Sequence, residues 1–177
     1  MRSIDIKRMV LAALFVALGF VLPFLTGQIP QVGSMLSPMH IPVLLCGFVC
    51  GPAWGLLVGA VTPLLRSLVL GMPPLFPVAA AMAFELAAYG LLAGLLYQRL
   101  PKKPINIYVT LIAAMLLGRV VWGLAMAALL GLSGGSFGLQ AFLAGAFINA
   151  WPGILLHIAL IPPIVLALEK AKFLPLK

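Results

Sequence analysis

Apolar runs long enough to cross a membrane recur along this chain, and they constrain its fold more than any motif does. Residues 9–25 include no charged residue, and residues 78–97 include only Glu85. A helix needs about 20 mainly apolar residues to span a bilayer. With 64% hydrophobic and 8% charged residues, the 177-residue chain has the composition of an integral membrane protein.

These runs predict an all-α fold. No segment shows the alternation of apolar and polar residues, about ten residues long, that marks the strands of an outer-membrane barrel. We therefore expect one membrane domain over residues 1–177, a bundle of six transmembrane helices. The second helix is too short to cross alone, and the sixth is expected to break near Trp151. The predicted ranges are 9–25, 41–50, 53–70, 78–97, 105–131 and 139–168.

Basic residues gather at the ends of the predicted helices. Six crossings place residues 1–8, 99–103 and 169–177 on one side, and these segments hold every lysine and every arginine except Arg66 and Arg119. By the positive-inside rule, that side is the cytoplasm, so both termini are predicted to be cytoplasmic. Lipid headgroups and topology therefore account for the net charge of +8, and we expect membrane lipids as partners and no nucleic acid.

Three charged residues lie inside the predicted membrane segments: Arg66, Glu85 and Arg119. A lone ion at mid-membrane costs at least ~2.5–3.5 kcal/mol, so each needs a partner or a polar cavity. Two arginines with one carboxylate leave a positive charge, which predicts a site for an anion. Two pairings are open: Arg66 with Glu85, which leaves Arg119 for the ligand, or Arg119 with Glu85. We expect the first, because a hairpin can bring Arg66 and Glu85 to a similar depth.

Other side chains are predicted to line the same cavity. Met82, Glu85 and Tyr89 follow at i, i+3 and i+7 and share one helix face. Trp122 lies one turn from Arg119, and Asn149 either bonds a ligand or joins two helices. The predicted substrate-binding residues are Arg66, Met82, Glu85, Tyr89, Arg119, Trp122 and Asn149.

The polar connection at residues 26–40 is expected on the external side, either as a lid or as a plain connector. His40, at its end, is expected to be a capping or interfacial residue, and His157 to be packed in the bundle. Cys46 and Cys50 suit buried thiols and offer too few ligands for a metal, so no metal or cofactor is expected. Ala13 and Ala17 form a small-xxx-small pair, which serves either internal packing or a docking face.

Motifs of ATPases, zinc proteases and serine hydrolases are missing from the sequence. We therefore expect no enzyme. One alternative is a small membrane enzyme that uses Glu85 and His157 as acid and base, although their predicted depths differ by several turns. Another is a solitary secondary transporter.

The chain resembles the substrate-binding S components of energy-coupling factor (ECF) transporters. The resemblance rests on the short six-helix chain and the Ala13-x-x-x-Ala17 pair. It also rests on two stretches, MHIPVLLCGFVCGP at residues 39–52 and TPLLRSLVLGMPPLFPVAAAMAFELAAYGLLAGLLY at residues 62–97.

The resemblance implies a multi-pass protein of a prokaryotic plasma membrane that takes up a water-soluble vitamin or related micronutrient. The ligand would be held near the outer face by residues 78–97, 105–131, 139–168 and the external loops. The partners implied are a transmembrane coupling subunit, docked through Ala13 and Ala17, and two ATPase subunits. Among the family's ligands, an anion such as pantothenate or folate suits the charge excess better than thiamine does.

Overall fold

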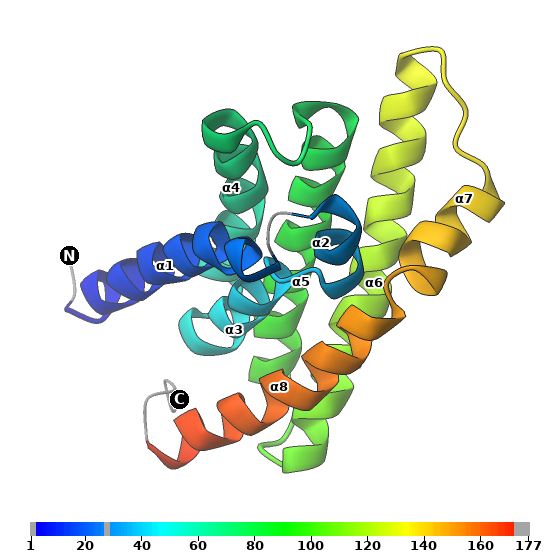
Figure 1. Ribbon diagram of the computed structural model, residues 1–177. Coiled ribbons are helices and arrows are strands. Elements are labelled where there is room, and N and C mark those ends of the chain that lie inside the picture. Colours follow the sequence, from blue (N-terminus) through cyan, green and yellow to red (C-terminus); the bar gives the residue numbers. More distant parts are fainter. Residues whose placement is uncertain (1–2, 27–28, 172–177) are drawn as a thin grey trace.

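The computed structural model describes residues 3–26 and 29–171, and every regular element in those ranges is helical (Figure 1). The predicted all-α fold is confirmed. The elements are α1 (Ser3–Val21), η1 (Leu22–Thr26), α2 (Pro30–Leu36), α3 (His40–Cys50), α4 (Pro52–Leu70), η2 (Leu75–Ala79), α5 (Ala80–Arg99), α6 (Pro104–Leu132), α7 (Leu139–Leu143), η3 (Ala144–Ile148) and α8 (Trp151–Lys170).

Five helical segments of the described chain are long and apolar enough to cross a membrane: Ile6–Leu25, Pro52–Leu70, Leu75–Arg99, Pro104–Leu132 and Leu139–Lys170. The sixth predicted helix, α3, has 11 residues and rises only about 16 Å, roughly half the thickness of a hydrocarbon core. Six crossings and the side on which the termini lie therefore stay predictions.

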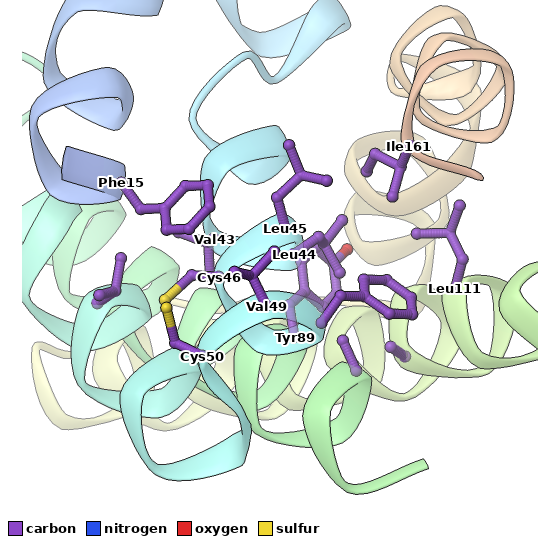
Figure 2. Close-up of a cluster of buried hydrophobic side chains, with 14 of the residues drawn as sticks. Phe15, Val43, Leu44, Leu45, Cys46, Val49, Cys50, Tyr89, Leu111 and Ile161 are labelled. Atoms are coloured by element: carbon purple, nitrogen blue, oxygen red, sulfur yellow. The ribbon is translucent and has the colours of Figure 1, made fainter. Parts of the chain in front are cut away.

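Helix α3 can be stable at this short length because it is buried on all sides. Ten of its 11 residues are buried, and it packs against α1, α4, α5 and α8. A helix that is apolar all round belongs inside a protein, where its ends do not meet lipid. Figure 2 shows this core, in which α3 side chains such as Val43, Leu44 and Cys46 lie among Phe15, Tyr89, Leu111 and Ile161 from four other helices.

Helices α4, α5 and α6 lie side by side (Figure 1), and α5 packs on both of its neighbours. The α4–α5 contact is backbone against backbone. A Cβ added to Gly90 would lie 2.1 Å from the carbonyl oxygen of Gly55, and one added to Gly59 would lie 2.2 Å from that of Leu86. Small residues allow such close approach between membrane helices.

Two connections differ from the prediction in detail. The expected loop at residues 26–40 includes a two-turn helix, α2, which begins at Pro30, a residue favoured at a helix start. The predicted last helix is broken, as expected, but into α7, η3 and α8. The break falls at Asn149 and Ala150, and Pro152 then lies in the first turn of α8.

We predict that Gly90→Ala lowers the free energy of unfolding by roughly 1–3 kcal/mol, the usual penalty for overpacking, because its methyl group would meet the Gly55 backbone. The matched control is Gly131→Ala in α6, where nothing lies within 4 Å of the added Cβ. The control should be neutral or stabilising by up to about 1 kcal/mol. Denaturant unfolding in detergent, followed by circular dichroism, makes the comparison. Equal stability of the two variants would contradict the close α4–α5 packing.

Candidate functional site

A cavity of about 500 Å³ opens at the end of the bundle where α3 begins. Its walls come from the 29–40 connection, α4, the 72–74 turn, α5, α6 and η3. The lining residues are Pro23, Ile29, Gln31, Gly33, Ser37, Pro38, Met39, His40, Arg66, Met72, Pro73, Pro74, Val78, Met82, Glu85, Arg119, Trp122, Gly145 and Asn149. Ligand pockets commonly measure about 300–1,000 Å³, so the cavity has the size for a small organic molecule.

The structure brings the predicted site residues together. Six of the seven line this cavity: Arg66, Met82, Glu85, Arg119, Trp122 and Asn149. The seventh, Tyr89, is fully buried beside them and donates a hydrogen bond to Glu85. Contact of these residues with a ligand stays a prediction.

The carboxylate of Glu85 is the centre of the polar contacts in the cavity. Its Oε1 lies 2.9 Å from Nη1 of Arg119, accepts a 3.0 Å hydrogen bond from the Tyr89 hydroxyl and lies 3.6 Å from Nε2 of His40. The Glu85 side chain is only 2% exposed. A buried carboxylate is stable only when it is paired and hydrogen-bonded, and Arg119 and Tyr89 meet both requirements.

The predicted pairing of Arg66 with Glu85 is wrong, because the Glu85 carboxylate forms its ion pair with Arg119. Arg66 instead donates a hydrogen bond to the Phe20 carbonyl. That carbonyl lies in the last turn of α1, where carbonyl groups have no partner within the helix. The guanidinium carbon also lies 5.2 Å from the Phe24 ring centroid and 5.9 Å from that of Phe20. Arg66 therefore packs against α1, and its charge has no carboxylate partner among the described residues.

His40 is the main cavity residue that sequence reasoning missed. Its Nδ1 lies 3.1 Å from the Ser37 carbonyl, which agrees with the expected capping role, while its Nε2 faces Glu85. The ring stacks on that of buried His157 at 5.9 Å between centroids. No hydrogen bond or ion pair joins His157 to Glu85 in the described chain, and His157 does not line the cavity.

Aromatic side chains close the cavity on the side of η3. Trp122 meets the Phe137 ring edge-on at 5.7 Å and stacks on Phe142 at 6.4 Å. A Cβ added to Gly145 would lie 2.6 Å from the Trp122 ring, so the backbone of η3 lies directly on the indole. Phe137 lies in the connection before α7, whereas Phe142 and Gly145 lie on α7 and η3, within the range predicted as the last helix.

Within the described residues, no three His, Cys, Asp or Glu side chains gather in a way that could hold a metal ion. Cys46 and Cys50 are free and buried in the core.

Arg119→Met should lower the free energy of unfolding by about 3–5 kcal/mol, because it strands the buried Glu85 carboxylate. The double variant Glu85→Leu/Arg119→Met should recover most of this loss, since a buried ion pair can be replaced by apolar side chains at little cost. Arg66→Met is the matched control, because it also removes a membrane arginine but strands no carboxylate. Denaturant unfolding without added ligand tests this order of stabilities. A larger loss of unfolding free energy for Arg66→Met than for Arg119→Met would contradict it.

Comparison with known proteins gives one assignment. The family model described as ECF transporter, substrate-specific component, matches residues 7–165 of the 177-residue chain. Comparisons with curated proteins and with solved structures give no match. Because the family match covers most of the chain, this protein belongs to the family of substrate-specific components of ECF transporters.

Proposed function

We propose that this protein is the substrate-capturing subunit of an ECF-type importer of a prokaryotic plasma membrane, which binds a water-soluble vitamin or related micronutrient outside and delivers it inward. Family membership supports a substrate-specific transport subunit. The observation that carries the finer proposal is the 500 Å³ cavity, with buried charged residues in its wall, at one end of a chain of apolar helices.

The direction of uptake follows from where the charges lie. The cavity is lined by the 29–40 connection and the 72–74 turn. The opposite ends of α5, α6 and α8 carry Arg99, Lys103 and Lys170. If this basic side faces the cytoplasm, as the positive-inside rule predicts, the cavity opens toward the outside and receives ligand there.

The sequence shows no phosphate-binding loop of an ATPase, which agrees with a subunit that is energised by a partner. We propose that a transmembrane coupling subunit with two ATPase subunits supplies the energy for delivery. The docking face we assign is the exposed side of α1, which carries Ala13 and Ala17. Both alanines are exposed, whereas Ala12 and Phe15 on the other side of the helix are buried. This exposure supports a docking face over packing inside the bundle.

The two alternatives receive less support. An enzyme with Glu85 and His157 as acid and base needs the two groups within reach of one substrate atom, but His157 lies outside the cavity and makes no bond to Glu85. A solitary secondary transporter would move its ligand in vesicles that lack any ATPase, which is the observation that would favour it.

The double variant Ala13→Trp/Ala17→Trp should abolish co-purification with the coupling subunit, and with it uptake, because bulky rings would hold the two helices apart. Ligand binding by the isolated protein should stay normal, since neither alanine lines the cavity. The matched control is Val120→Trp/Leu124→Trp, a pair with the same spacing whose native side chains are 50% and 67% exposed on α6.

Loss of ligand binding together with docking would show that the alanines support the bundle itself. Normal docking of the alanine variant would place the coupling surface elsewhere. A protein that never associates with a coupling subunit and ATPase pair, and binds no vitamin in a thermal-shift panel, would overturn the proposed function.

A further inference from the structure

We infer that the ligand is an organic monoanion held at two poles, with its carboxylate at Arg66 and a neutral hydrogen-bonding group at the cluster of Glu85, Arg119 and His40. The inference rests on the proposed function and specifies the class of substrate. It departs from the sequence-based expectation, which gave the anion to Arg119.

The charges of the cavity set the charge of the ligand. Among the described residues, three charged side chains line it, and the contact between Glu85 and Arg119 cancels two of these charges. The chain has only three acidic residues. Glu169 accepts a hydrogen bond from Tyr97 near the C-terminal end of α5. Asp5 lies about 22 Å along α1 from Phe20, the residue that Arg66 contacts. One positive charge, that of Arg66, therefore remains for a ligand.

Arg66 is built to receive an anion. It lines the cavity although it is only 4% exposed, so its guanidinium is largely removed from water. A guanidinium has five N–H donors, and the Phe20 carbonyl takes one of them. The rings of Phe20 on α1 and Phe24 on η1 offset part of the desolvation of the cation but supply no negative charge. A carboxylate fits the planar fork of arginine with two parallel hydrogen bonds.

The second pole calls for a neutral group. Nε of Arg119 and Nε2 of His40 are both buried and have no hydrogen-bond partner. The contact of His40 Nδ1 with the Ser37 carbonyl requires a proton on Nδ1, and Nε2 is left to face the cavity and Glu85. The N–H donor of Arg119 and the ring nitrogen of His40 match an amide, a ureido group or a hydroxyl group, because each of these can both accept and donate a hydrogen bond. A second anion is not needed, because Glu85 already balances Arg119.

The space between the poles excludes a bare inorganic ion. The cavity measures about 500 Å³, and Val78, Met82 and Trp122 supply apolar surface to its wall. Such surface is stabilised by the carbon skeleton of a ligand and not by water. The site therefore fits a small organic acid with a polar, uncharged far end.

The test is isothermal titration of the full-length protein in detergent with carboxylates and their neutral counterparts. The probes are pantothenate against pantothenol, biotin against biotinamide, and nicotinate against nicotinamide, with riboflavin and thiamine as neutral and cationic vitamins. We expect at least one carboxylate to bind roughly 30-fold or more tightly than its counterpart, which is the usual effect of a buried charged contact.

The preference for the carboxylate should depend on Arg66 alone. Arg66→Gln should bind both members of the pair with equal affinity, and Arg66→Lys, which keeps the charge but not the fork, should retain part of the preference. His40→Phe should weaken both members equally and leave their ratio unchanged. Lys103→Gln is the matched control, since it also removes one positive charge, but from the exposed start of α6, and should keep the wild-type affinities.

Each outcome bears on the inference. A neutral or cationic vitamin that binds best would overturn it and leave the proposed function standing. Arg66→Gln that keeps the carboxylate preference would also overturn it. If this variant does not fold, either equal binding of the pairs by the wild-type protein or an undiminished preference in Arg66→Lys does the same. Failure of every carboxylate to bind overturns the inference, and failure to associate with a coupling subunit as well overturns the proposed function.

Discussion

The ion pair between Glu85 on α5 and Arg119 on α6 determines that Arg66 is the charged residue of the cavity without an ionic partner among the described residues. At 2.9 Å and almost without exposure, the pair neutralises the one carboxylate among the described residues that line the cavity. Tyr89 and His40 are positioned against the same oxygen. Arg66 thereby contacts the Phe20 carbonyl on α1 and the Phe24 ring on η1, and it is a cation in the cavity wall without a counter-charge among the described residues. In a medium of low dielectric, such an imbalance is a strong reason for a protein to bind an anion.

The cavity exists because α3 is short. With 11 residues, this buried helix covers about half the depth of a bilayer, and its first residue, His40, already lines the cavity. The 29–40 connection and the 72–74 turn fold over the remaining space and supply much of the wall. The backbone contacts of Gly55 and Gly59 with α5 hold α4 against it, so the rigid half of the bundle supports a site whose other walls are connections. A firm scaffold with loop-built walls is a common arrangement for binding sites.

The sequence was sufficient for the helical class, for most helix ranges and for six of the residues that line the cavity, because apolar length and depth can be read along a chain. Depth does not reveal which helices are neighbours or which way they are rotated, and so the Arg66–Glu85 pairing was wrong although both residues line the cavity. His40 looked like a capping residue and is one, but its second contact, with Glu85, depends on tertiary structure. Gly90 and Gly55 carried no visible signal, since glycine is frequent in membrane helices.

The most direct test of the account is a structure of the protein with its ligand bound in the cavity. The account predicts the ligand's carboxylate within hydrogen-bonding distance of the Arg66 guanidinium, with the Glu85–Arg119 contact intact and a neutral ligand group beside His40. A carboxylate bound to Arg119, with Glu85 displaced from it, would contradict the account. So would a ligand held without any contact to Arg66.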